Sequence, residues 1–164
     1  MKDDKLIQQI LNAWQVNERT NATLLKAISV SGLKAVPYGS RGRNVSQVFS
    51  HMYKVRFAWL RYNDGNLVND LPMFPRAAAP TKFQLKNALS LSDQAVRILL
   101  LQCLNGERSI KMFKRNPVRW MSYLISHESH HRGQIALALK QNGMRLPPDV
   151  ALRGLWQEWY SGRP

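Results

Sequence analysis

Four stretches of the chain repeat apolar residues at helical spacing. They cover approximately residues 4–29, 44–63, 82–105 and 117–142. Within each, apolar side chains recur every three or four residues, the spacing that gathers them on one face of an α-helix. In the last stretch, Trp120, Leu124, Ile135 and Ala138 share such a stripe. No pair of segments shows the strict alternation expected of neighbouring strands. The pattern therefore predicts an all-α protein.

Residues at the ends of these stretches act as start and stop signals. Asn44 and Thr81 precede the second and third stretches and can cap a helix through their side-chain oxygens. Asn116 followed by Pro117 is a typical helix start, because proline at the first helical position loses no hydrogen bond. Gly143 follows the fourth stretch and is a typical terminator. These signals support four helices with the boundaries given above.

Two further segments complete the expected architecture. Residues 64–80 contain Pro72, Pro75 and Pro80, which predicts a long irregular connection between the second and third helices. After Pro147 and Pro148, a short C-terminal helical segment is predicted from four apolar residues: Leu152, Leu155, Trp156 and Trp159. Four long helices of similar length predict an antiparallel four-helix bundle, a fold that hosts metal sites on facing helices. At 164 residues, we expect a single domain spanning 1–164.

The charge balance of the chain is strongly basic. Twenty-four Lys and Arg against 10 Asp and Glu give a net charge of +14. Residues 34–61 and 108–119 carry many of these basic side chains and contain no acidic residue. Such a balance favours acidic partners, including nucleic acid. Because no zinc-finger, RNA-recognition or helix-turn-helix signature accompanies the charge, a solvated basic surface is favoured over nucleic-acid binding.

The chain shows no sign of secretion or membrane insertion. Cys103 is the single cysteine, which excludes an intramolecular disulfide framework. No apolar run approaches the roughly 18–20 residues that a membrane-spanning helix needs. The charged N-terminus lacks the apolar core and cleavage site of a signal peptide. We expect a soluble cytoplasmic protein that does not contact membranes.

Three of the four histidines fall on core-facing helix positions. His127 and His131 are four residues apart, so they lie about 40° apart around a helix axis. His51 lies in or beside the apolar stripe of the second helix. Each histidine alone is more simply a hydrogen-bonded core residue, but burying three imidazoles without partners would be costly. The set therefore predicts a metal site formed by His51, His127 and His131. His130, about 100° away from His131 around the helix, is expected either to contact a metal ligand without binding the metal or to face solvent.

The same segment also satisfies the H-E-x-x-H pattern of zinc metallopeptidases. In that interpretation Glu128 would be the general base, and a third ligand would come from downstream. Glu158 is the only downstream glutamate, and position 137 is leucine, which excludes the metzincin continuation. The metallopeptidase hypothesis is therefore less favoured. Glu128 also precedes Arg132 by four residues, so an ion pair at the helix surface is an alternative role for it.

Three segments together resemble the DinB family, also called the DinB/YfiT-like metalloenzymes. They are Asn44–His51, His127–Ile135 with its H-x-x-x-H-R-G-Q core, and the proline-rich Leu146–Asp149 that follows Gly143. The resemblance implies a four-helix bundle with a long crossover between the second and third helices. It also implies a divalent metal on His51, His127 and His131, and a homodimer. Family members with known chemistry include bacillithiol transferases and mycothiol-dependent isomerases.

These features lead to one main hypothesis and two alternatives. The main hypothesis is a metal-dependent thiol S-transferase or hydrolase with a small-molecule substrate and Glu128 as candidate general base. Its cofactors would be a divalent transition metal and a low-molecular-weight thiol. Zinc or nickel suits three imidazoles best, and iron or manganese is also compatible. One alternative is a basic stress-response nucleic-acid-binding protein with a structural histidine cluster. The other is a metal that fixes the fold without catalysis.

Overall fold

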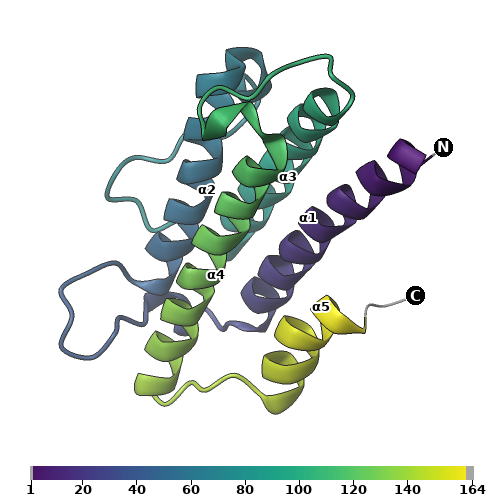
Figure 1. Ribbon diagram of the computed structural model, residues 1–164. Helices are drawn as coiled ribbons and strands as arrows, with labels where there is room; N and C mark the ends of the chain where they lie inside the picture. The colour runs from purple at the N-terminus through teal and green to yellow at the C-terminus, as the bar shows by residue number, and fades with distance from the viewer. Residues whose placement is uncertain (1, 162–164) are drawn as a thin grey trace.

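A computed structural model describes residues 2–161 (Figure 1). Its helices are α1 (Lys2–Ala27), α2 (Val45–Asn63), α3 (Lys82–Leu104), α4 (Pro117–Gln141) and α5 (Glu158–Tyr160). Four shorter helical turns accompany them: η1 (Gly32–Lys34), η2 (Gly65–Val68), η3 (Phe113–Arg115) and the π-helical η4 (Asp149–Gln157). The described part of the chain contains no strand, which confirms the all-α prediction. None of its helices combines the length and the apolar character needed to cross a membrane.

The predicted helix starts are confirmed by their capping contacts. Asn44 and Thr81 each accept a hydrogen bond from the backbone N–H three residues on, where a glutamine returns the contact. Asn116 caps α4, and Pro117 occupies its first turn. The end of α1 differs, since Ala27 closes it before the expected Ser29. The Ser29 hydroxyl instead accepts from the N–H of Gly32, so it supports the following turn in place of the helix.

Each of the four long helices packs against others of the set. Both α1 and α2 contact α3 and α4, and α3 also contacts α4. Figure 1 shows the four helices side by side, with η4 and α5 lying along α1. Residues from all four helices form the core, among them Trp14, Phe49, Leu89 and Leu124, which are all buried. The apolar stripes read from the sequence therefore face one another.

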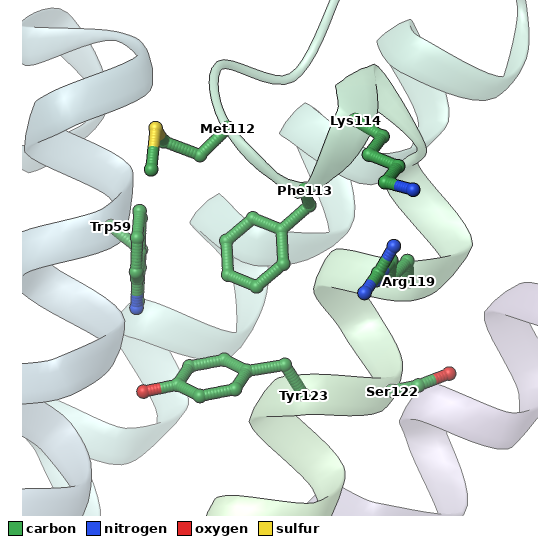
Figure 2. A pocket seen from close by; sticks show the side chains of 7 residues that line it. All are labelled: Trp59, Met112, Phe113, Lys114, Arg119, Ser122 and Tyr123. Atoms are coloured by element: carbon green, nitrogen blue, oxygen red, sulfur yellow. The ribbon is translucent and has the colours of Figure 1, made fainter.

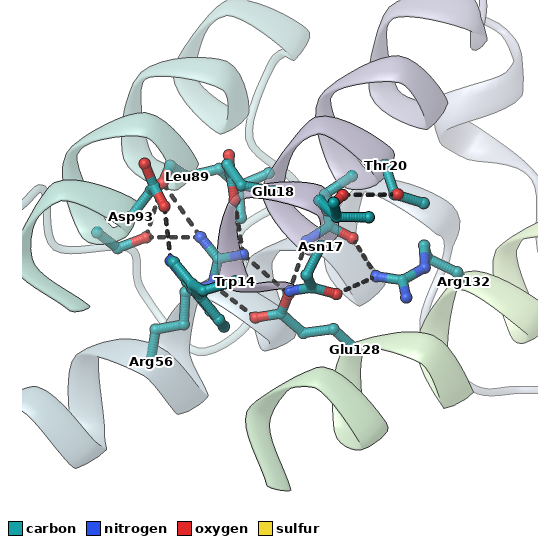
Figure 3. A network of polar contacts seen from close by, with 12 residues as sticks. Trp14, Asn17, Glu18, Thr20, Arg56, Leu89, Asp93, Glu128 and Arg132 are labelled. Atoms are coloured by element: carbon teal, nitrogen blue, oxygen red, sulfur yellow. Dashed lines mark hydrogen bonds and ion pairs between the residues drawn. The ribbon is translucent and has the colours of Figure 1, made fainter. Parts of the chain in front are cut away.

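A polar network lies inside this otherwise apolar core (Figure 3). The carboxylate of Glu128 in α4 accepts from Nε and Nη2 of Arg56 in α2, at 2.5 and 2.8 Å. Asn17 and Asn21 of α1 each donate to the same carboxylate at 2.6 Å. Their amide oxygens in turn accept from Nη1 of Arg132, at 2.7 Å each. Nη1 of Arg56 also donates to the carbonyl of Leu89 in α3, so all four long helices share one set of buried hydrogen bonds.

The ion pair at the centre of the network is fully buried. Neither Arg56 nor Glu128 retains exposed surface. A buried charge costs several kcal/mol unless it is paired and hydrogen-bonded. The pair therefore strongly disfavours any sliding of α2 against α4 that would separate the guanidinium from the carboxylate. The network thus fixes the helix register on which the site depends.

The surface ion pair proposed between Glu128 and Arg132 is wrong. Glu128 is buried against Arg56, and Arg132 is also buried and bonds the amides of α1. Both positions continue the core-facing stripe of α4, four and eight residues after Leu124. The two residues do lie one helical turn apart, but on the buried face of the helix.

A second carboxylate, Glu18, also accepts from Arg56, at 2.7 Å. Burial raises the pKa of Glu18 from about 4.5 to about 7, and nearby Glu128 adds to the rise while Arg56 opposes it. For Glu128, burial also raises the pKa, but the charge and hydrogen bonds of Arg56 and the two asparagine amides outweigh it and leave the pKa lowered. One guanidinium therefore keeps Glu128 ionised, while Glu18 becomes ionised only near neutral pH.

The raised pKa of Glu18 predicts a pH-dependent loss of stability. Its protonated form is favoured by the fold, so this contribution is present below pH 4.5 and is lost as the pH rises to about 7. Replacing Glu18 by Gln removes the titration. Between pH 5 and pH 8, we expect the unfolding free energy of the wild type to fall by about 1–3 kcal/mol relative to Glu18→Gln. Urea denaturation of both proteins measures this difference, and parallel pH profiles would contradict it.

Removing the charge of Glu128 should cost far more stability than removing a surface charge. Glu128→Gln leaves the buried guanidinium of Arg56 without its bidentate partner, and we expect a loss of about 3–5 kcal/mol. The matched control is Glu107→Gln, at an exposed position, which we expect to change stability by less than about 0.5 kcal/mol. Denaturation at pH 7 measures both, and equal effects would rule out the structural role of the pair.

Candidate metal centre

The three predicted ligands converge at the interface of α2 and α4. Nε2 of His127 lies 3.3 Å from Nε2 of His51 and 3.1 Å from Nε2 of His131. The potential ligand atoms of all three lie within 4.8 Å of one another. His131 is buried, and the other two are half-buried. One turn of α4 and one side chain of α2 thus form a single cluster of imidazole nitrogens.

Gln134 orients the ring of His131. Nδ1 of His131 lies 2.8 Å from the side-chain oxygen of Gln134. An amide oxygen only accepts, so Nδ1 carries the proton and Nε2 presents its lone pair to the cluster. The amide nitrogen of Gln134 donates to Nε2 of His130 at 2.9 Å. His130 is exposed and lies outside the cluster, as its position on the helix indicates.

The donor set fits a divalent transition metal. Ligands at 2.0–2.1 Å around a tetrahedral metal are separated by about 3.3 Å, close to the spacings of the Nε2 atoms. Hydrogen bonds alone account poorly for this packing, because the bare Nε2 of His131 and Nε2 of His51 both face His127, which has one Nε2 proton at most. Nδ1 of His127 is itself buried without a hydrogen-bond partner in the described residues. A cation would satisfy all three facing lone pairs.

All three imidazoles are held in the neutral form that binds metals. Burial, together with Arg43 and the two other histidines, lowers the pKa of His51 to about 4. Burial likewise lowers the pKa of His127, with His131 adding to the effect. For His131, burial lowers the pKa and outweighs the opposing effect of the hydrogen bond that Nδ1 donates to Gln134. The lone pairs are therefore free for coordination at neutral pH.

An aromatic hollow of about 640 Å³ is lined by residues of α2, α4 and the turn that precedes α4 (Figure 2). Trp59, Phe113 and Tyr123 form its wall, with ring centroids 4.8–6.0 Å apart. Tyr123 stacks on His127, with centroids 6.1 Å apart and ring planes 24° from parallel. Residues 112–115 all have positive φ angles, which are strained for side chains of these types. This strained turn places Phe113 against the two other rings.

The positions of the two glutamates argue against a metallopeptidase. The Glu128 carboxylate is bound by Arg56 of α2 and by two asparagines of α1, so it is not available to the histidines as a general base. Glu158, the only downstream glutamate, instead forms an ion pair with Arg19. The third histidine of the cluster is His51 of α2. The H-E-x-x-H spacing therefore supplies two histidines of the cluster and one core residue.

Two residues at the site were missed by sequence reasoning. Tyr123 precedes His127 by four residues, so the helical spacing already places both side chains on one face. Ser50 precedes His51 and is buried, although serine is more often found at the surface. Tyr123 could have been found from the period of α4. Ser50 carries no sequence signal, because its burial depends on the segment packed against α2.

The chain was compared with protein families, curated proteins and solved structures. The model of the DinB family matches residues 1–161. The comparisons with curated proteins and with solved structures found no match. The match spans nearly the whole chain and includes both helices that carry the histidine cluster. The chain therefore belongs to the DinB family.

Proposed function

We propose that this protein is a metal-dependent enzyme with His51, His127 and His131 as metal ligands. The observation that carries the proposal is the convergence of three Nε2 atoms from two helices, with the neighbouring pairs 3.1 and 3.3 Å apart. A structural metal site is usually closed by a fourth protein ligand. Among the described residues, the cluster of potential ligands contains three side chains. The donor set therefore favours a catalytic over a structural metal.

The helices that carry the ligands form an antiparallel four-helix bundle in this proposal. The pairwise contacts of the four long helices and their connections support it, as does membership of the DinB family. Bundles of this kind bind metals through side chains of facing helices. Here α2 contributes one ligand, and α4 contributes two from successive turns.

The reaction that we propose is thiol S-transfer or hydrolysis of a small molecule. A divalent metal on three neutral imidazoles, zinc or nickel before iron or manganese, lowers the pKa of a thiol or water that it binds. Gln134 keeps the proton of His131 on Nδ1, so the ligating nitrogen stays free. Tyr123 covers one face of His127, and the aromatic hollow beside it suits an apolar portion of the substrate.

Glu128 positions the site in this proposal and does not transfer protons. Its carboxylate is hydrogen-bonded to Arg56, Asn17 and Asn21, and its lowered pKa keeps it ionised. Because His127 is the neighbour of Glu128 in α4, fixing Glu128 also fixes the backbone position of His127. We infer that Glu128 acts on the metal centre through the register of α2 and α4.

The exposed apolar face near the C-terminus supports the proposed homodimer. Leu152, Trp156 and Tyr160 are spaced four residues apart along η4 and α5, and all three are exposed. We expect Leu152→Ser with Trp156→Ser to convert a dimer into a monomer, because a stable interface needs a buried apolar centre. Sedimentation velocity measures the change. A wild type that stays monomeric at high concentration would exclude the dimer.

Metal content tests the proposed ligands directly. We expect protein purified without a histidine tag to carry about one zinc or nickel ion per chain after loading. Alanine at His51, His127 or His131 should lower the metal affinity by at least about tenfold, because each variant removes one of three ligands. Elemental analysis after dialysis against a weak chelator measures this.

The matched control is His130→Ala, which removes a neighbouring exposed imidazole outside the cluster. We expect it to retain metal as the wild type does. Metal retained by the double variant His51→Ala, His131→Ala would contradict the proposal. An absence of stoichiometric metal in the loaded wild type would also contradict it.

A further inference from the structure

A second hollow, of about 540 Å³, opens next to the histidine cluster. His51 is one of its lining residues, so the hollow shares a wall with the proposed metal centre. Four cationic side chains also line it: Arg41, Arg43, Lys54 and Arg76. No acidic residue is among the lining residues. The hollow is therefore strongly positive on the side facing His51.

These charges are not neutralised by neighbouring side chains. Arg41, Arg43 and Arg76 form no ion pair with any residue that the structure describes. Arg43 lies close enough to the cluster for its charge to lower the pKa of both His51 and His131. Lys54 likewise acts on His51. Unpaired cations around a hollow of this kind attract an anion.

A buried hydroxyl in the same hollow lacks a partner. Ser50 is 2% exposed, and its Oγ forms no hydrogen bond within the described part of the chain. It lines the hollow beside His51. A buried hydroxyl without a partner is costly, so native proteins almost always satisfy it. Ser50 therefore points, independently of the charges, to a polar ligand in this hollow.

One wall of the hollow is the segment of residues 75–80, which three hydrogen bonds from α2 hold in place. Lys54 donates to the carbonyl of Pro75 at 2.8 Å, and Gln47 donates to that of Ala77 at 3.2 Å. The hydroxyl of Ser46 donates to the carbonyl of Pro80 at 2.6 Å. The connection between α2 and α3 is thus fastened along α2 where Arg76 lines the hollow. These contacts hold this part of the wall in place without a ligand.

We propose that this cationic hollow binds an anionic group, a carboxylate or a phosphate, of the small-molecule substrate of the metal centre. The proposal rests on the proposed function and names the class of substrate for it. Arg41, Arg43 and Arg76 bind the anionic group, and Ser50 donates its unused hydrogen bond to the same molecule. The substrate then extends past His51 toward the cluster.

The volume of the hollow favours a small molecule over a nucleic acid. Ligand pockets of about 300–1,000 Å³ enclose most of a small molecule. Nucleic-acid sites instead follow an extended backbone with many phosphate contacts. The buried hydroxyl of Ser50 offers a further hydrogen bond inside the hollow, which binding of a nucleic-acid backbone at the surface would not use. Binding of a nucleic acid in place of a small anion would therefore contradict the proposal.

The test compares two triple variants that change the net charge equally. Arg41→Gln, Arg43→Gln, Arg76→Gln removes three cations of the hollow. Lys86→Gln, Lys140→Gln, Arg145→Gln removes three exposed cations that do not line it. Titration calorimetry with the metal-loaded proteins uses tricarballylate, inorganic phosphate and a 12-nucleotide single-stranded DNA as probes. Metal content is measured on the same samples.

At least one of the two small anions should bind the wild type. We expect its Kd to rise by about tenfold or more in the first triple variant and by less than about twofold in the second. Ser50→Ala should raise the Kd by about threefold without lowering the melting temperature, because its hydroxyl contributes no bond to the fold. The first triple variant should keep its metal.

Several results would overturn the proposal. The wild type could bind neither small anion, or could bind the DNA alone. The two triple variants could lose anion affinity equally, or Ser50→Ala could bind the anion as tightly as the wild type does. Failure of the metal proposal is recognised separately. If the protein lacks stoichiometric metal but still binds a small anion through the three arginines, the proposed metal centre is contradicted and the anion site is not.

Discussion

The buried pair of Arg56 and Glu128 is the constraint on which the rest of the structure depends. Both charges are fully buried, and their bidentate contact joins α2 to α4. Arg56 follows His51 by five residues, and Glu128 is the neighbour of His127. Since a separated buried charge would cost several kcal/mol, the pair allows only one register of the two helices. That register brings Nε2 of His51 to 3.3 Å from Nε2 of His127.

The α4 helix uses two faces for different purposes within the six residues from His127 to Arg132. His127 and His131 face α2 at the histidine cluster, whereas Glu128 and Arg132 bind the amides of α1. The sequence therefore matches the metallopeptidase pattern, but the structure does not, because the glutamate of the pattern is buried in the core. His51 of the cluster lines the cationic hollow, and His127 stacks on Tyr123, which lines the aromatic hollow. This arrangement suits a substrate with an anionic part and an apolar part.

Much of the fold could be predicted from the sequence, because helical periodicity and capping residues are local signals. The caps at Asn44, Thr81 and Asn116 are where the pattern puts them, and the three histidines meet as expected. The role of Glu128 could not be predicted, because its partners come from α1 and α2, distant in sequence. The absence of acids from residues 34–61 signalled a basic surface. It did not show that Arg76 of the following connection completes a hollow. The cytoplasmic location and the thiol cofactor stay predictions.

X-ray absorption spectroscopy of the protein loaded with one equivalent of zinc tests the central claim most directly. The account predicts a first shell of nitrogen and oxygen at about 2.0–2.1 Å, with the multiple scattering of three imidazoles and one further light ligand. Substituting His51 by Ala should reduce the imidazole signal from three rings to two. A sulfur shell near about 2.3 Å, or a wild-type spectrum without imidazole scattering, would contradict the three-histidine centre.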